Sequence, residues 1–432
     1  MRKIVLLLII CITAMMLTSC KDANELDDLI HVIILGVDRG VSDKWRLTIK
    51  FPTLKEGSVG GTGGGSSGGG SSGGGGGSRQ GGYASLTVDA PSFFTGIDML
   101  NSTESRRLNF MHTEVLIISE DLAKSGMLGE FLAPIIRFRQ IRRSMHIFVV
   151  KGSVMNSIGT TGPIVGTALS KNLDILVDEA DKTGFFPHVT LQSFYDHMKS
   201  AYRQPAVILG AVGSPENLKQ DGEKWGNKFK TGGEYYAGEL PTNSQNVIEL
   251  FGAAVFDGDK MVGKLNGNET RLMQMANGEF EMGAFTMQDP KEPSLVVPFN
   301  VRQAKKPKVM IKFEGDKPII HLKVSLEGDI LAIQSRINYE QLELKPLLER
   351  AFEKQIKGGL DKLMEKSKGL KTDIFGFGQF AARHFLTIQK WEKYNWCNKF
   401  QNAEITTEVE FTIRRMGTQL KSSPITTSKG KK

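Results

Sequence analysis

The side chains most often used in catalysis and metal binding are few and scattered in this chain. Its 432 residues include seven histidines, which form neither a His-x-His pair nor a His-Glu-x-x-His motif. The cysteines Cys11, Cys20 and Cys397 are too far apart in sequence for a Cys-based zinc motif. His112, beside an expected strand, could act as an acid or base, but a structural histidine is the more common case. We therefore expect no metal, no cofactor and no catalytic residue, and the protein is not predicted to be an enzyme.

A tract of almost pure glycine and serine over residues 57–82 contains matches to the G-x-S-x-G motif, such as Gly65 to Gly69. A nucleophilic serine in that motif needs a strand before it and a helix after it. The tract offers neither, and no Lys-Ser or Lys-Thr pair follows it to complete a phosphate loop. Because it has almost no side chains to bury, we predict a disordered surface insert.

Cys20 is the one cysteine with a clear chemical context. A basic start precedes an apolar run over residues 4–17, which leads into Leu17-Thr18-Ser19-Cys20. This pattern is typical of a secretory signal, and its end resembles the bacterial lipobox, in which the thiol receives diacylglycerol and the chain is cut before it. The run is short for a bilayer span. The alternatives to lipid attachment are an uncleaved span and secretion without a lipid. We expect lipid attachment at Cys20, which would anchor the protein to a membrane.

Basic residues outnumber acidic ones, and the formal net charge is +8. Arg137, Arg139, Arg142 and Arg143 lie within seven residues of one another. On a membrane-anchored protein such charges favour contact with anionic lipid head groups, whereas the ordinary alternative is a solvated basic face. Nucleic acid is not an expected partner outside the cytoplasm.

Hydrophobic periodicity predicts the elements that would carry these residues. A buried strand over 29–35 and an alternating strand over 45–51 are expected to form a hairpin. A short helix is predicted from Pro91 to Asn101 with Ser92 as its N-cap. A helical pattern over 122–138 should be kinked or divided at Pro134.

The C-terminal part carries the clearest patterns. A long amphipathic helix and a final alternating strand over 405–413 are predicted there. The apolar stripe of the helix comprises Leu348, Phe352, Ile356, Leu360 and Leu363.

The order of elements indicates an α+β or mixed α/β protein, with mixed sheets flanked by helices and three domains. The expected divisions are a signal peptide (1–19), an N-terminal mixed α/β domain (20–205) containing the insert (57–82), a β-rich middle domain (206–305), a C-terminal α/β domain (306–416) and a disordered basic tail (417–432).

The segment Asp373-Ile374-Phe375-Gly376-Phe377-Gly378 combines two glycines with two phenylalanines. Glycine permits tight backbone geometry, and aromatic rings bury large areas at low entropic cost. This composition fits a loop that docks a partner through Asp373, Phe375, Gly376, Phe377 and Gly378. The alternative is a turn between helices whose phenylalanines enter the chain's own core.

Several segments, taken in order, resemble the C-subunit lipoproteins of bacterial spore germinant receptors, the Ger(x)C family. Lys21 stands where that family usually has Trp, and the Gly/Ser insert is not part of the usual pattern. The resemblance is carried by Leu17–Cys20, Asn24–Leu29, Leu35–Asp38, Arg107–Glu114, the hairpin Phe251–Gly263 and Asp373–Gly378, with Trp391 following.

The resemblance implies a non-catalytic protein tethered by lipid on the outer face of the spore inner membrane. It also implies integral-membrane A and B subunits as partners, in a complex that senses small nutrients and triggers germination. An extracytoplasmic solute-binding lipoprotein is the alternative, although such proteins usually have two similar α/β lobes, which the β-rich middle disfavours. A surface hydrolase is disfavoured by the missing catalytic constellation.

Overall fold

The computed structural model describes residues 2–4, 28–53, 79–80, 82–160, 168–221, 229–243, 248–417, 419, 421–428 and 430–431. Cys20, the rest of the predicted lipobox and nearly all of the Gly/Ser insert lie outside these residues. None of the described helices is both long enough and apolar enough to cross a bilayer.

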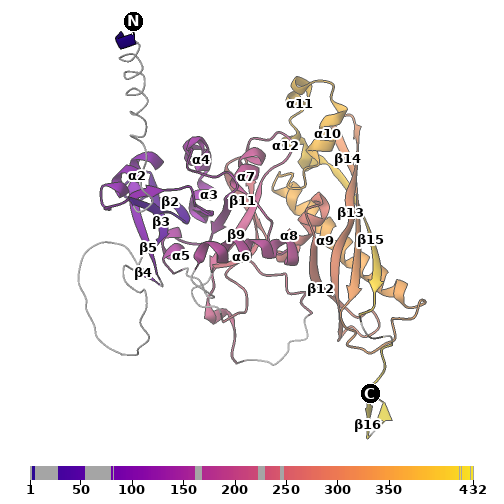
Figure 1. The fold of residues 1–432 in the computed structure, drawn as a ribbon. Helices are drawn as coiled ribbons and strands as arrows, with labels where there is room; N and C mark the ends of the chain where they lie inside the picture. Colours follow the sequence, from indigo (N-terminus) through magenta and orange to yellow (C-terminus); the bar gives the residue numbers. More distant parts are fainter. Residues whose placement is uncertain are drawn as a thin grey trace.

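The N-terminal unit is built on a nine-stranded sheet (Figure 1). Its central strands β2, β7, β8 and β9 are parallel, and the outer strands are antiparallel to their neighbours. In sheet order the strands are β11 (Lys260–Leu265), β10 (Ile248–Asp257), β9 (Ala206–Val212), β8 (His146–Val150), β7 (Val115–Ser119), β2 (Ile34–Arg39), β3 (Trp45–Pro52), β5 (Tyr83–Ala90) and β4 (Arg79–Gln80).

Helices cover both faces of this sheet and enclose two apolar cores. One face packs against α2 (Phe93–Asn101), α3 (Glu120–Ser125), α4 (Leu128–Arg137) and α7 (Leu191–Met198), which lie above the sheet in Figure 1. The other face packs against α5 (Val154–Thr160) and α6 (Leu169–Thr183). A small parallel pair, β1 (Leu29–His31) and β6 (Arg107–Asn109), lies beside this unit.

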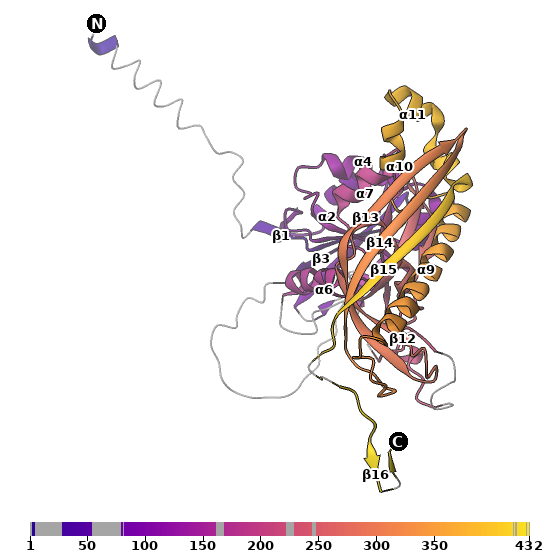
Figure 2. The same ribbon diagram turned by 90° about the vertical axis from the view of Figure 1, so that its right-hand side faces the viewer.

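The C-terminal unit is a four-stranded sheet in the order β12 (Met282–Gln288), β13 (Val296–Glu314), β14 (Lys317–Ile330), β15 (Glu404–Arg415). Figure 2 shows β13, β14 and β15 side by side, with the long helix α9 (Lys345–Gly369) running along them. All five residues of the predicted stripe on α9 are buried against the sheet. Glu349 and Glu353 of this helix accept hydrogen bonds from the backbone of β15, at Ile413 and Phe411, and so cover part of that edge.

Helix α8 (Gly267–Asn277) lies between the two sheets and joins their cores. Leu272, Met273 and Met275 pack in one apolar cluster with side chains of β10 and of the four-stranded sheet. Arg271 and Gln274 of the same helix donate hydrogen bonds to the carbonyl oxygens of Thr183 and Gly184 at the C-terminal end of α6. The two units are therefore packed together through shared side chains.

The chain between α9 and β15 is built from short helices: α10 (Gly378–Ala381), η3 (Ala382–His384), α11 (Ile388–Tyr394), α12 (Trp396–Lys399) and η4 (Phe400–Asn402). A further short turn, η2 (Pro215–Asn217), follows β9. After residue 417, β16 (Thr426–Thr427) and β17 (Gly430–Lys431) form a two-residue antiparallel pair, in the segment that we expected to be a disordered tail.

The mixed α/β fold class predicted from sequence is confirmed, and so are several elements. The expected hairpin forms between β2 and β3, but the strand predicted over 29–35 is divided, since residues 29–31 form β1 and pair with β6 instead. The side chain of Ser92 caps α2 as predicted. The pattern over 122–138 is divided at the left-handed Gly126, while Pro134 lies inside α4. Strands from 206–305, expected to form a domain of their own, are divided: β9, β10 and β11 join the first sheet, and β12 and the first part of β13 join the second.

Candidate functional site

The predicted docking segment forms a tight turn between α9 and α10, called here the Asp373 turn (residues 373–378). One carboxylate oxygen of Asp373 accepts hydrogen bonds from the backbone of Phe375 (3.1 Å) and Gly376 (2.9 Å). The other accepts from the backbone of Gly378 and from the Trp396 indole, both at 2.8 Å. Gly376 has a φ of +77°, which glycine adopts without strain. One buried carboxylate thus organises the whole turn.

The Asp373 turn is bound to the N-terminal unit by a reciprocal contact with Gln204. The backbone N–H of Asp373 donates to the Gln204 side chain (2.7 Å), and the Gln204 backbone donates to the Asp373 carbonyl oxygen (3.0 Å). A Cβ at Gly378 would collide with the carbonyl oxygen of Tyr202. The Tyr202 ring in turn stacks on Trp391 at 5.5 Å between centroids. The turn therefore packs against the segment before β9 of the same chain.

Several charged groups beside the turn lie at the contact between the two units. Burial raises the pKa of Asp373, while the N–H donors and nearby Arg203 act in the opposite direction. Arg203 pairs with Glu279, with N–O distances of 2.8 and 3.4 Å. Burial, assisted by Arg203, lowers the pKa of His197 to about 4, so this imidazole is neutral at physiological pH.

The five predicted docking residues are all buried in the structure. Phe377 is fully buried and Phe375 is 4% exposed, and their rings stack at 5.2 Å. The side chains of this set are enclosed by the folded chain itself, which disfavours docking of another protein through this segment. The alternative interpretation, a turn whose phenylalanines enter the chain's own core, describes the structure. Sequence reasoning missed Gln204, which contacts Asp373, and Arg203, which interacts with it electrostatically, because each lies about 170 residues away along the chain.

The other polar groups noted in the sequence lie in surroundings that fit a structural role. Burial, followed by the nearby Asp373 charge, raises the pKa of Cys397 to about 11, which keeps the thiol protonated at neutral pH. His112 lies edge-on to His31, with 5.0 Å between ring centroids. Within the part of the chain that the structure describes, no three His, Cys, Asp or Glu side chains are grouped to bind a metal. Lipid attachment at Cys20 stays a prediction, since that residue is not described.

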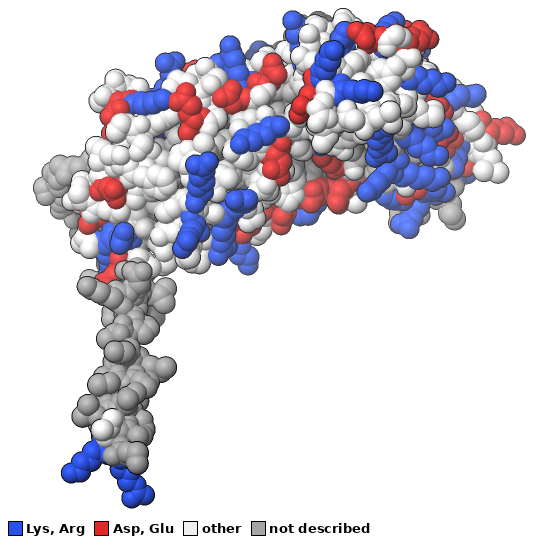
Figure 3. Space-filling model, turned by 90° about the horizontal axis from the view of Figure 1, so that it is seen from above, with Lys and Arg blue, Asp and Glu red and all other residues white. Residues whose placement is uncertain are grey.

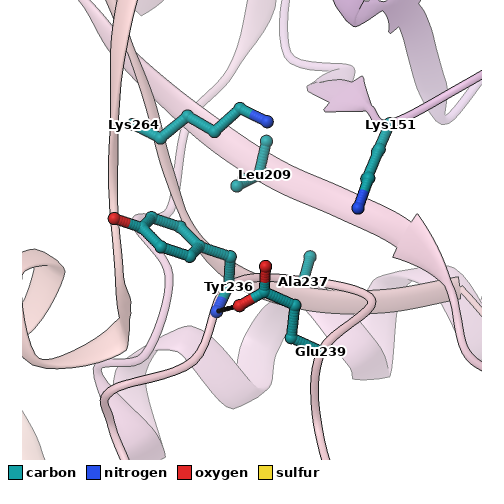
Figure 4. A pocket seen from close by; sticks show the side chains of 6 residues that line it. All are labelled: Lys151, Leu209, Tyr236, Ala237, Glu239 and Lys264. Carbon is teal, nitrogen blue, oxygen red and sulfur yellow. Dashed lines mark hydrogen bonds between the residues drawn. The ribbon is translucent and has the colours of Figure 1, made fainter. Parts of the chain in front are cut away.

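One small cavity opens at the carboxyl end of the parallel strands (Figure 4). It has a volume of about 180 Å³, whereas ligand pockets usually hold about 300–1,000 Å³. The Glu239 carboxylate at its floor accepts a hydrogen bond from the backbone of Tyr236 (3.3 Å), and Lys264 donates to Glu120 (2.7 Å). The lining residues are Lys151, Leu209, Tyr236, Ala237, Glu239 and Lys264.

Two family models match the chain, and together they span both structural units. A model described as spore germination protein N-terminal domain matches residues 22–211, and one described as spore germination B3/GerAC like, C-terminal, matches residues 251–417. The chain belongs to the Ger(x)C family of spore germination proteins. The second match includes the Asp373 turn, and the first includes Gln204, so the contact between the units lies within the family's own region.

Curated relatives match this Ger(x)C chain over nearly its whole length. Spore germination protein YndF of Bacillus subtilis (strain 168) is 21% identical over 96% of this chain and 98% of the relative. Spore germination protein KC of the same organism is 23% identical over 98% of each chain. A solved structure, described as the crystal structure of the GerBC protein, has 16% identity and a TM-score of 0.47, and covers 88% of this chain and 96% of that one. The resemblance inferred from sequence motifs is confirmed, and membership of this family supports a role in spore germination.

Proposed function

We propose that the chain is a non-catalytic, lipid-anchored subunit of a nutrient germinant receptor in the spore inner membrane. In this proposal it lies on the outer face of that membrane and acts in germination with an integral-membrane A subunit and a B subunit. The observation that carries the proposal is family membership over both units, in a chain whose start ends in Leu17-Thr18-Ser19-Cys20. Two acyl chains on one cysteine give stable membrane anchoring.

A structural rather than chemical role for the buried polar groups supports the non-catalytic part of the proposal. Both carboxylate oxygens of Asp373 accept hydrogen bonds from within the turn and from Trp396. Arg203 is paired with Glu279, and the Cys397 thiol is protonated at neutral pH. The Arg203–Glu279 pair and the Gln204–Asp373 contact join the two units, so these polar groups serve the packing of the fold.

The test replaces the native copy of the chain in spores with a Cys20→Ala variant. We expect this variant to leave the membrane fraction, and nutrient-triggered release of dipicolinate to fall to the level of spores that lack the chain. Cys11→Ala is the matched control, because it changes a cysteine of the same leader that signal cleavage would remove. Wild-type germination by Cys20→Ala spores, with the protein still in the membrane fraction, would contradict the proposal.

A solute-binding lipoprotein is the alternative function. The two units have different topologies, a nine-stranded and a four-stranded sheet, rather than two similar lobes. The cavity at Glu239 is also small for an enclosed nutrient. Calorimetric titration of the purified chain with amino acids and sugars separates the two functions: the receptor-subunit proposal predicts no tight binding by the chain alone, and micromolar binding would favour the alternative.

A further inference from the structure

Two segments of the N-terminal unit, residues 104–112 and 137–143, form what we call the arginine patch. Together they contain six arginines and one acidic residue, Glu104. Five of the arginines are exposed and Arg106 is half-buried. Figure 3 shows Lys and Arg side chains on this upper face of the molecule, as well as at the opposite end over the four-stranded sheet. The exposed arginines are Arg107, Arg137, Arg139, Arg142 and Arg143.

Aromatic packing brings the two segments of the patch together. The Phe138 ring lies within 6.0 Å of Phe93, Phe94 and Phe110, measured between ring centroids. The backbone of Phe110 also donates a hydrogen bond to the Gln140 side chain (3.1 Å). Arg137 and Arg139 flank Phe138 in sequence, so this aromatic contact holds them beside residues 104–112. The positions of the charges are therefore set by the fold.

The positive charge of the patch is largely uncompensated. Among the described residues, no carboxylate lies within salt-bridge distance of any of the six arginines, whereas Arg46 and Arg302 elsewhere are paired with aspartate or glutamate. Glu114 interacts electrostatically with Arg142 without forming a salt bridge. Exposed apolar side chains accompany the patch: Met111 of its first segment is 50% exposed, and Phe94 of α2, whose ring lies 5.4 Å from that of Phe138, is 44% exposed. Cationic and apolar groups together match the interfacial region of an anionic bilayer.

The patch lies where the chain from the predicted lipid enters the body. Strand β1 pairs with β6, which places Leu29 opposite Arg107. Only seven residues lie between Cys20 and Asp28, where the described body begins, so the two are eight residue steps apart. At about 3.3–3.6 Å per residue, the connecting chain spans at most about 29 Å. A body tethered so closely brings this surface near the head groups.

We infer that the arginine patch binds the anionic head groups of the membrane in which Cys20 is anchored. Acyl chains on a single residue attach a protein to a membrane at one point, and the patch supplies a second contact that would orient the body. The inference rests on the proposed function for its membrane, while the patch itself is a property of the folded body. Lipid phosphates are the occupant that the uncompensated arginines and their apolar neighbours fit.

The test measures flotation of the mature chain with Cys20→Ser, which carries no lipid, on two kinds of vesicle. One is phosphatidylcholine alone, and the other is phosphatidylcholine mixed with phosphatidylglycerol. We expect binding to the mixed vesicles only, weakened by salt because the charges are exposed. A variant with Arg107, Arg137, Arg139 and Arg142 changed to Gln should bind at least about tenfold more weakly, since each basic residue near an anionic surface contributes about a fivefold factor.

The matched control changes Lys305, Lys306, Lys308 and Lys312 of β13 to Gln. It removes the same charge from exposed positions on the other sheet, and binding should change less than about twofold if the patch is specific. Equal loss in both variants, or equal binding to neutral vesicles, would overturn the inference. If the four-arginine variant fails to keep the wild-type thermal midpoint, Arg137→Gln with Arg139→Gln replaces it.

Two outcomes separate this inference from the proposed function. If the arginine variant binds vesicles as the wild type does but no longer copurifies with membrane subunits, the patch is a protein contact and the lipid inference fails. If vesicle binding is absent while Cys20 still directs the chain to the membrane fraction, the lipid inference fails and the receptor-subunit proposal stands.

Discussion

The Asp373 turn and the arginine patch are both dense in unusual residues, and the fold treats them in opposite ways. The turn lies in the interior, where four N–H groups surround one carboxylate. The patch lies at the surface, where arginines stand without salt-bridge partners among the described residues. A short aspartate can be saturated by backbone donors at little entropic cost, whereas six long cations cannot be buried without as many acceptors. Amino-acid composition therefore shows that a segment is unusual, but it does not show whether the segment is buried or exposed.

The largest expected effect is at the carboxylate of the turn. Asp373→Ala would leave four buried N–H donors without an acceptor, and each unsatisfied donor costs about 1–3 kcal/mol. We expect the free energy of unfolding to fall by about 4 kcal/mol or more, measured by urea titration. Asp316→Ala is the matched control, because that side chain is 79% exposed and should matter little. Equal effects of the two changes would remove the contrast between interior and surface.

The next largest effect is at Phe377, which is fully buried. Phe377→Ala should lower the free energy of unfolding by about 3–4 kcal/mol, because it removes a ring and leaves a cavity. Leu386→Ala, at a side chain that is 90% exposed, should change it by less than about 0.5 kcal/mol. A Phe377→Ala protein of normal stability that has lost a binding partner would instead restore the docking interpretation.

Acid should weaken the contact between the units through His197. Its pKa is about 4 in the folded chain against 6.5 for the free side chain, so the unfolded chain binds more protons between these values. Stability should therefore fall as the pH is lowered from about 6.5 towards 4, by about 1–2 kcal/mol after allowance for partial exposure. His197→Gln should remove that part of the pH dependence in urea titrations at several pH values. His384→Gln, at an exposed histidine, should leave the profile unchanged, and an unchanged profile for both would contradict the prediction.

The smallest effect on stability is expected in the patch. Arg137→Gln combined with Arg139→Gln should change the free energy of unfolding by less than about 0.5 kcal/mol, because both side chains are exposed and form no salt bridge with a described residue. Thermal unfolding of this variant beside the Asp373→Ala protein gives the sharpest form of the comparison. A destabilisation as large as that of Asp373→Ala would mean that the arginines hold the fold together.

Local patterns predicted much of the fold. The stripe on α9 and the alternation in β15 were readable because each element is regular and packs one face against a core. The cap at Ser92 was readable because it depends on residues within three positions. The division of 206–305 between two sheets could not be predicted, because the sequence patterns of β9 and β10 do not indicate which sheet these strands join.

The site was harder to predict than the fold for the same reason. Glycines and phenylalanines marked the Asp373 turn as special, but its burial depends on Gln204, about 170 residues away. The arginines of 137–143 were readable as a cluster. Their contact with 104–112 depends on rings from α2 and from the residue after β6 packing against Phe138. Long-range contacts of this kind leave no periodic trace in the sequence.

Recovery of the chain from detergent-solubilised spore membranes tests the central claim most directly. The chain is captured through a C-terminal tag, and the copurifying proteins are identified by mass spectrometry, beside the Cys20→Ala chain. The account predicts that a multi-span subunit and a second membrane subunit copurify with the wild-type chain, and that recovery of this complex drops when Cys20 is changed. Capture of the intact, membrane-derived chain with neither subunit would contradict the account.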